Sequence, residues 1–255
     1  MSSNKKSNLF FYVWDIAYPF LMYYGVLTLA YTGATIIFGE DNSKYMYCQT
    51  LATVITLPVM YFSFYRIQYH EKVKISERKN IYIAIIHTIL CISLGLNNVI
   101  NMSPFVDMSQ GYKDATAGFY GSTVAIEIIG VGILTPILEE LVFRGIIYDK
   151  LKKMMSAKQA VIVSALLFGV IHFNVVQFIY AFLIGIMLAV FVDASGSVWG
   201  AIIAHICSNV FAVLRTEYHM LDGICDGSVL AWVVSIVILL AGIAGCSYII
   251  RHVER

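Results

Sequence analysis

The sequence predicts an all-α fold, a polytopic transmembrane helical bundle of about eight spans with both termini cytoplasmic. Of the 255 residues, 59% are hydrophobic and only 13% are charged, and the mean hydropathy is +0.77. A soluble domain carries about 25% charged residues. Several apolar runs are long enough to cross a bilayer, and the alternating pattern of a membrane β-barrel is absent from the sequence.

The N-terminal part is expected to supply three spans. Three apolar segments are assigned to them: 16–39, 45–65 and 81–100. The second and third are separated by a basic loop, 66–80. Segment 101–120 contains Pro104, Gly111 and Gly118 and is predicted to be a loop.

The C-terminal part is expected to supply the other five spans. The fourth span begins near residue 121 and continues to about 153, longer than a bilayer requires, so it should tilt or protrude. Segment 159–192 has no charge, is too long for one straight span and is short for two. It is predicted to form two short helices joined by a tight turn after His172. Segments 194–214 and 229–250 complete the set.

The distribution of Lys and Arg predicts the orientation. Cationic residues concentrate on the cytoplasmic side of membrane proteins. With the N-terminus inside, the inner segments hold most of the 17 cationic residues: Lys5, Lys6, Arg66, Lys72, Lys74, Arg78, Lys79, Lys150, Lys152, Lys153, Lys158, Arg251 and Arg255. The outer segments hold Lys44, Lys113 and Arg215, and Arg144 lies within the membrane. A multi-pass protein of the cell membrane, in contact with lipid, is therefore expected.

Two glutamates and an arginine interrupt the fourth apolar run. A charge in hydrocarbon is costly and persists where it has a partner or faces a polar cavity. On a helix, Glu140 and Arg144 are i,i+4 neighbours and can pair. Glu139 points about 100° away from Glu140, so one carboxylate is neutralised and the other is left free. The alternative is an ion pair that only locks two helices together.

Two histidines and an asparagine are predicted to join this pair of carboxylates. Helical rise places Glu139 roughly 16 Å, His172 roughly 21 Å, His205 roughly 12 Å and Asn209 roughly 18 Å from the inner surface. A free carboxylate near imidazoles and an amide can activate water and stabilise an oxyanion. His172, His205 and Glu139 could also hold Zn²⁺ with an open coordination position. The HExxH motif is absent, so the spacing does not make metal ligation the default. The ligand types slightly favour zinc, and a metal-independent site stays an alternative.

At these residues the sequence resembles a known family. EExxxR at Glu139, FxxxH ending at His172 and HxxxN from His205 to Asn209 resemble the CAAX-protease and bacteriocin-processing (CPBP, or ABI) family, related to the type II CAAX prenyl endopeptidase. The resemblance implies an intramembrane endopeptidase in which Glu139 activates water. It also implies that Glu140 and Arg144 support Glu139, and that His172, His205 and Asn209 complete the site. Whether such enzymes use a metal is not settled by these motifs.

The expected organisation is one membrane domain in three parts. They are an N-terminal three-span region, 1–120, a catalytic core, 121–215, and a C-terminal span, 216–255. The expected substrate is a membrane-associated peptide or protein, reached from the cytoplasmic side or the inner leaflet. The net charge of +1 gives no hint of nucleic-acid binding. The rival functions are a non-catalytic immunity or chaperone protein that binds a peptide, including bacteriocin immunity, and a proton-coupled transporter.

Other polar and aromatic residues receive structural interpretations. Glu127 is expected to be a packing or gating residue. The many Tyr and Phe side chains are expected mostly to face lipid or the interface. No cysteine pair has the CxxC spacing, and a Cys48–Cys225 bridge is possible, although such cysteines more often behave as small apolar residues.

Overall fold

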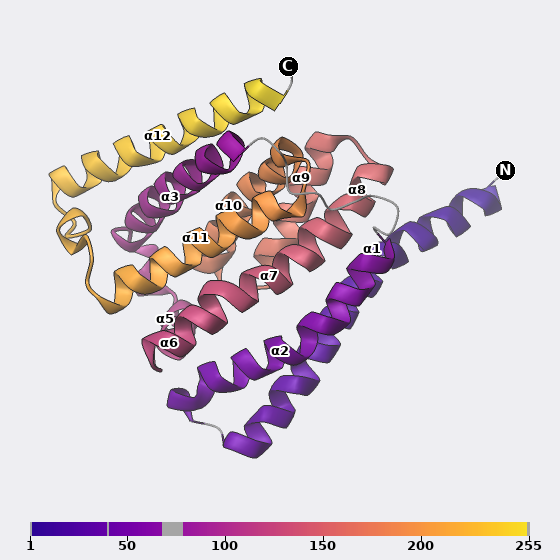
Figure 1. Ribbon diagram of the computed structural model, residues 1–255, viewed down its shortest axis with the longest axis horizontal. Coiled ribbons are helices and arrows are strands. Elements are labelled where there is room, and N and C mark those ends of the chain that lie inside the picture. Colours follow the sequence, from indigo (N-terminus) through magenta and orange to yellow (C-terminus); the bar gives the residue numbers. More distant parts are fainter. Residues whose placement is uncertain (1, 40, 68–78, 254–255) are drawn as a thin grey trace.

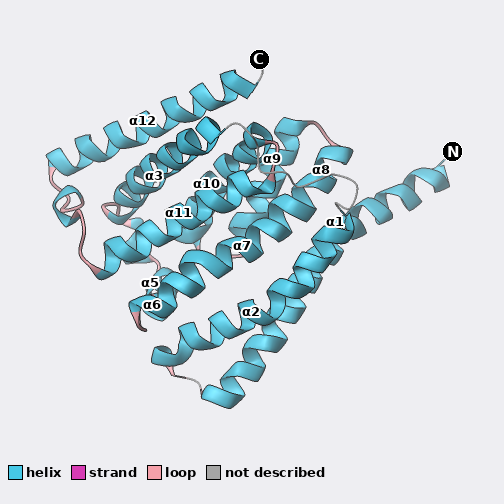
Figure 2. Cartoon of the chain, viewed as in Figure 1, coloured by secondary structure: helices cyan, strands magenta, loops and turns pink. Residues whose placement is uncertain are grey.

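The computed structural model describes residues 2–39, 41–67 and 79–253, and this part of the chain is helical without a strand. Figure 2 shows helices joined by short loops. The elements are α1 (Ser2–Phe38), α2 (Asn42–Ile67), α3 (Lys79–Asn101), α4 (Phe105–Met108), α5 (Gln110–Phe119), α6 (Val124–Glu127), η1 (Ile128–Leu134), α7 (Thr135–Glu140), η2 (Leu141–Tyr148), α8 (Asp149–Met154), α9 (Ala157–Val170), α10 (Val175–Ser195), α11 (Val198–Glu217), η3 (Asp222–Ile224) and α12 (Val229–Val253). The predicted all-α class is confirmed.

The helical run from α6 to α8 passes through the middle of the bundle. It packs against α11 on one side and α2 on the other, while α12 packs mainly on α3 at the periphery (Figure 1). The N-terminal end of α1 and the C-terminal end of α12 lie at the same end of the bundle (Figure 1). The site residues of the central run are therefore enclosed by helices from both halves of the chain.

Ion pairs join the elements that the charge pattern assigns to the inner side. Lys150 Nζ lies 3.2 Å from Asp15 Oδ1, and Lys152 Nζ lies 2.9 Å from Asp193 Oδ1. These pairs connect α8 to the first part of α1 and to the last turn of α10. The inner ends of these three elements therefore lie at one level, as predicted. Residues 68–78 of the predicted basic loop lie outside the described residues.

Hydrogen bonds join the elements assigned to the outer side in the same way. Ser122 Oγ donates to Ser43 O at 3.0 Å, and Asn98 Nδ2 donates to Ile224 O at 3.1 Å. The start of α2, the end of α3 and the loops that flank α6 and α12 therefore share the opposite end of the bundle. The helices alternate in direction as the topology prediction requires.

The number of complete spans is six or seven by helix length and apolar composition. Six single helices qualify, and α5 with the run 124–154 adds a seventh, bent by 110°. The remaining predicted span corresponds to α9, which has only 14 residues and is shorter than a straight crossing. The polytopic membrane bundle is confirmed, whereas the count of eight and the cytoplasmic side of the termini stay predictions.

The predicted loop at 101–120 is wrong for most of its length, which forms the short helix α4 and the longer helix α5. Ser109 begins α5, because its Oγ accepts a hydrogen bond from Tyr112 N at 3.3 Å. Tyr112, Thr116 and Phe119 then share the face of α5 that points into the bundle. The glycines at 111 and 118 suggested a loop, but their i,i+7 spacing lets α5 pack closely: a Cβ at Gly118 would lie 3.2 Å from the Tyr45 ring.

The predicted break near His172 is confirmed, although the turn begins before His172 and includes it. Helix α9 ends at Val170 and α10 begins at Val175, and Phe173 between them adopts a φ of 55°. Asn174 caps α10, since its side chain accepts from Gln177 N at 2.9 Å. The Tyr24 hydroxyl donates to Ile171 O at 3.2 Å. These bonds satisfy backbone groups of a turn at membrane depth, where water is scarce. The second helix is not short as predicted: α10 has 21 residues.

Candidate active site

Glu140 and Arg144 form the buried ion pair that their spacing predicts. Arg144 Nη1 donates to Glu140 Oε1 at 3.3 Å, and Arg144 Nε lies 3.3 Å from Glu140 Oε2 at an angle unsuited to a hydrogen bond. Both side chains are fully buried. A charge without a partner would be costly at such a position, so each residue requires the other.

Further contacts fix the Arg144 guanidinium. Its Nη2 donates to Gly185 O at 2.9 Å, and its Cζ lies 4.4 Å from the centre of the Phe168 ring, in a cation–π contact. A Cβ at position 185 would lie 3.0 Å from Arg144 Nη2, so glycine leaves the room that this approach requires. The pair thus ties the central run to α9 and α10.

His205 joins the two adjacent glutamates. Its Nδ1 lies 2.9 Å from Glu140 Oε1, and its Nε2 lies 3.9 Å from Glu139 Oε2. The first contact is a hydrogen bond, whereas the second is too long for one. The sequence predicted that His205 would meet Glu139 but did not predict the bond to Glu140. The depths estimated for the two elements did indicate that such a contact could form.

His172 lies in the turn after α9 rather than on the helix itself. Its Nδ1 is 3.0 Å from Phe168 O, and its ring packs edge-on against the Phe168 ring at 5.3 Å. The same Phe168 ring packs edge-on against His205 at 5.8 Å. Phe168 therefore lies between the two imidazoles and beneath the Arg144 guanidinium, which gives the first residue of FxxxH a positioning role.

Asn209 reaches the central run through a backbone carbonyl. Its Nδ2 donates to Val131 O at 3.0 Å. In the π-helical stretch η1, Thr135 N bonds Gly130 O, five residues earlier. The next bond of that register would join Pro136 N to Val131 O, but proline has no N–H. The Asn209 amide supplies the missing donor, and an amide nitrogen carries a second hydrogen for another acceptor.

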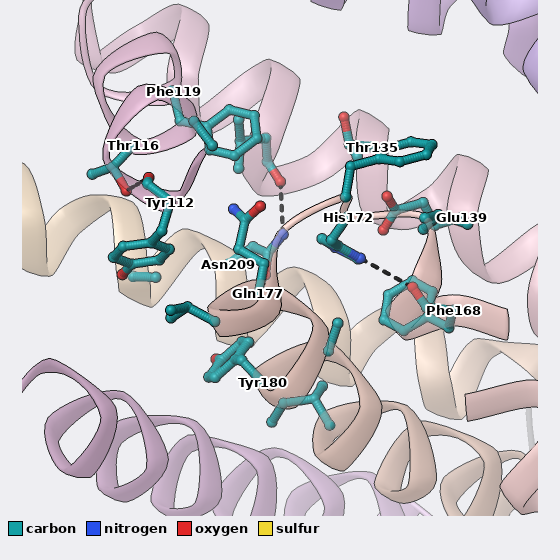
Figure 3. Close-up of a pocket in the computed structure, with 18 of the residues that line it drawn as sticks. Tyr112, Thr116, Phe119, Thr135, Glu139, Phe168, His172, Gln177, Tyr180 and Asn209 are labelled. Atoms are coloured by element: carbon teal, nitrogen blue, oxygen red, sulfur yellow. Dashed lines mark hydrogen bonds between the residues drawn. The ribbon is translucent and has the colours of Figure 1, made fainter. Parts of the chain in front are cut away.

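Glu139, His172, His205 and Asn209 all line one cavity of about 390 Å³. Figure 3 shows Glu139, His172 and Phe168 at one end of it and Tyr112, Thr116 and Phe119 at the other. Glu140 and Arg144 do not line it. The structure therefore brings all six predicted side chains together and separates them, as predicted, into a carboxylate that faces the cavity and an enclosed ion pair.

The hydrogen bonds fix the tautomer of each histidine. A carbonyl oxygen can only accept, so His172 Nδ1, bonded to Phe168 O, carries a proton. Glu140, paired with Arg144, accepts in the same way from His205 Nδ1. When the rings are neutral, both Nε2 atoms are then acceptors. His205 Nε2 and an ionised Glu139 Oε2 would then face each other as two acceptors, and the two atoms are 3.9 Å apart.

The donor atoms have the right chemistry for zinc, but their arrangement does not fit an ion. Histidine ligands of metals usually donate their other N–H to an oxygen, as both imidazoles do here. Yet among the described residues, no three His, Cys, Asp or Glu side chains come together around a point that could hold a metal. The zinc site at His172, His205 and Glu139 stays a prediction.

Some tyrosines face the cavity instead of the lipid or the interface, where most Tyr and Phe side chains were expected. Six line the cavity: Tyr23, Tyr24, Tyr45, Tyr112, Tyr120 and Tyr180. Tyr23 is 4% exposed and packs edge-on against Phe143. Thr135 also lines the cavity. Its position one turn before Glu139 was the signal in the sequence, because residues four apart share a helix face.

Three further residues, one glutamate and two cysteines, do not line the cavity. Glu127 is fully buried outside the cavity, and its Oε1 accepts from Ser122 N at 3.1 Å, in keeping with the expected packing role. Cys48 and Cys225 both have free thiols. The Cys48–Cys225 bridge that the sequence left possible does not form in this structure.

Comparison with known proteins relates the central region to a family. Residues 121–211 match the family model "Type II CAAX prenyl endopeptidase Rce1-like". Over these residues the chain is similar to the CAAX-protease and bacteriocin-processing family. The matched residues run from just before α6 into α11 and contain all six candidate site residues, so the family region coincides closely with the predicted core at 121–215. The division of the chain into three parts stays a prediction.

One curated relative matches 91 residues of this chain. It is the Bacillus subtilis (strain 168) protein described as "Putative membrane peptidase YdiL", with 31% identity over 91 residues. The alignment covers 36% of this chain and 37% of the relative. The chain therefore matches little more than a third of that protein's length. No solved structure gives a significant match to this chain. The family match and the apolar helices both support a multi-pass integral membrane protein.

Proposed function

We propose that this protein is an intramembrane endopeptidase of the cell membrane, which hydrolyses a peptide bond of a membrane-associated peptide or protein. One observation carries the proposal. In a family region of peptidases, Glu139 faces a cavity beside His205, while the adjacent Glu140 is neutralised by Arg144. A pair that only locked two helices would not need the second carboxylate.

Water activation follows from the two acceptors that face each other. A water molecule between His205 Nε2 and Glu139 Oε2 can donate one hydrogen to each, because 3.9 Å leaves it within hydrogen-bond distance of both. Its oxygen lone pairs then point to the cavity, where a substrate carbonyl would lie. Glu139 accepts one proton as the oxygen attacks the carbonyl carbon.

The remaining steps use the amide and the same carboxylate. The attack moves the carbonyl π electrons onto oxygen, and the second hydrogen of Asn209 Nδ2 can stabilise this oxyanion. Neutral His172 cannot, since its Nε2 is an acceptor. Glu139 then returns its proton to the amide nitrogen, the C–N bond breaks, and a carboxylic acid and an amine leave. Glu140 and Arg144 hold His205 in the orientation that this sequence requires.

Purified protein in lipid nanodiscs tests the proposal. A mixture of uncharged decapeptides is incubated with native protein, with Glu139→Gln and with Glu127→Gln, and new peptide ends are identified by mass spectrometry. Glu127 is a matched control, since it is a buried carboxylate of the same helical run but does not line the cavity. We expect native protein and Glu127→Gln to cleave and Glu139→Gln not to cleave. Equal peptide ends in all three samples would sink the proposal and favour a non-catalytic peptide-binding protein.

A further inference from the structure

The cavity continues well beyond the catalytic residues, in the direction of α5. Tyr112, Ala115, Thr116 and Phe119 of α5 line its far part. Figure 3 shows Gln177 and Asn209 between this end and Glu139. Helix α5 lies before residue 121, where the family match begins, so the side of the cavity that α5 forms lies outside the matched region. We call the part lined by α5, Gln177 and Tyr180 the α5 arm.

We propose that the α5 arm binds an uncharged peptide segment in extended conformation, next to the bond that is cleaved. The inference rests on the proposed function and names its substrate class.

The polar lining of the cavity favours an extended substrate over a helical one. An α-helix is about 10–12 Å across and pairs its own peptide N–H and C=O groups, so it would leave the polar side chains between α5 and Glu139 without backbone partners. An extended stretch presents its N–H and C=O groups to those side chains. A membrane helix would therefore have to unwind locally before its backbone could bind there.

The lining suits such a stretch, whose peptide groups lose their helical partners. An unpaired N–H or C=O costs several kcal/mol in the membrane core. The arm offers the Gln177 amide and the hydroxyls of Tyr112 and Tyr180. These hydroxyls already bond Asn101 Oδ1 and Ser208 Oγ, and their remaining lone pairs can accept from a peptide N–H. Gln177 Oε1 already accepts from Asn174 Nδ2 at 2.5 Å, so its nitrogen is the group directed to a ligand. Peptide carbonyls are the matching acceptors.

The charges of the lining exclude ionised side chains. Among the described residues that line the cavity, Glu139 is the only acid and neither Lys nor Arg occurs. A charged substrate side chain in the α5 arm would find no opposite charge there. Burying a charge without a partner is strongly unfavourable, so the arm selects uncharged residues.

Binding measured on the Glu139→Gln protein tests the inference without requiring cleavage. The probes are three dye-labelled, N-acetylated, C-amidated decapeptides of Ala, Leu, Gly and Phe, one unchanged, one with a central Lys and one with a central Asp. Fluorescence anisotropy is recorded with protein in nanodiscs, and empty nanodiscs correct for binding to lipid. We expect each charged peptide to bind about tenfold or more weakly. Equal affinity for the three peptides would overturn the inference.

Two alanines on α5 provide a matched pair of variants. Ala115 lines the cavity, whereas Ala117 is exposed on the other side of the same helix. Ala115→Phe fills the arm and should weaken binding of the uncharged peptide about tenfold or more, and Ala117→Phe should leave it unchanged. Gln177→Leu keeps the side-chain size, removes the amide and should also weaken binding. Native affinity in both Ala115→Phe and Gln177→Leu would refute the inference.

The two proposals can fail separately. If the uncharged peptide binds in the arm but native protein leaves every peptide intact, the endopeptidase proposal fails and the arm stands as a peptide site. If native protein cleaves peptides and Ala115→Phe binds and cleaves them equally well, the arm is refuted and the endopeptidase proposal stands.

Discussion

The two adjacent glutamates have opposite surroundings, and this difference decides what each can do. Glu139 is 8% exposed and faces the cavity, while Glu140 is 0% exposed and contacts both Arg144 and His205. The free carboxylate is suited to proton transfer. The paired carboxylate is suited to holding charge and orienting an imidazole.

Replacing each glutamate by glutamine should therefore have different effects. Glu139→Gln keeps the side-chain size and removes the base, so turnover should be abolished while the melting temperature in detergent stays near native. Glu140→Gln leaves Arg144 charged without its partner, and breaking a buried pair typically costs about 3–5 kcal/mol. It should lower folded yield and melting temperature as well as turnover, and Arg144→Ala should behave like it.

Turnover per folded molecule and melting temperature separate these outcomes. A stable but inactive Glu140→Gln together with an active Glu139→Gln would reverse the assignment. Native turnover in all three variants would exclude any catalytic role for this group of residues.

Zinc content tests the other hypothesis about Glu139, His172 and His205. Zinc would require these side chains to converge by a change of rotamer, since they do not surround a common point in this structure. On this hypothesis, we expect stoichiometric zinc by elemental analysis, lost in His172→Ala and kept in Asn209→Ala. A chelator should stop turnover and added zinc should restore it. Full turnover in metal-free protein would exclude the zinc hypothesis and leave the mechanism in which Glu139 accepts the proton of water.

Among the elements, the central run shows why a proline is tolerated in the middle of a span. Pro136 cannot donate to Val131 O, and Asn209 from α11 does so instead at 3.0 Å. The π-helical stretches η1 and η2 lie on either side of the two glutamates, and such stretches are frequent at functional sites. The irregular backbone thus depends on a side chain of a second helix.

This dependence predicts a measurable coupling between positions 136 and 209. Asn209→Ala leaves a buried carbonyl unsatisfied and should cost about 1–3 kcal/mol. Pro136→Ala restores a backbone N–H, so Asn209→Ala should cost less in its presence. A double-mutant cycle of unfolding free energies in detergent measures the difference. If the two effects simply add, the proline does not explain the Asn209 bond.

The sequence predicted elements well where one signal dominated, and less well where two competed. The apolar runs and the i,i+4 pair of Glu140 and Arg144 follow from composition and spacing alone. Helix α5 was missed because Gly111 and Gly118 outweighed the periodic spacing of Tyr112, Thr116 and Phe119. The bond between His205 and Glu140 depends on how α11 rotates against the central run, which helical periodicity does not determine.

For the whole molecule, the charge pattern and the contacts agree on two ends of the bundle. Lys150 and Lys152 form ion pairs at one end, together with the described ends of α1 and α12. The α5 arm of the cavity reaches toward the other end. If the lysine-rich end is cytoplasmic, the cavity leads from Glu139 toward the exterior side, where α5 lies. This direction does not match the access from the cytoplasmic side that the sequence predicted.

Cysteine labelling in intact cells decides the orientation and, with it, the side from which substrate arrives. The background protein carries Cys225→Ser, because Cys225 lies in the outer loop. Asp107→Cys and Asp222→Cys should react with a membrane-impermeant maleimide, and Lys152→Cys should react only after permeabilisation, because Lys residues favour the inside. In that case the α5 arm faces the exterior half of the bilayer, and a peptide delivered outside the cell should be cleaved. Labelling of Lys152→Cys in intact cells would invert the bundle, and the same arm would then admit substrate from the cytoplasm.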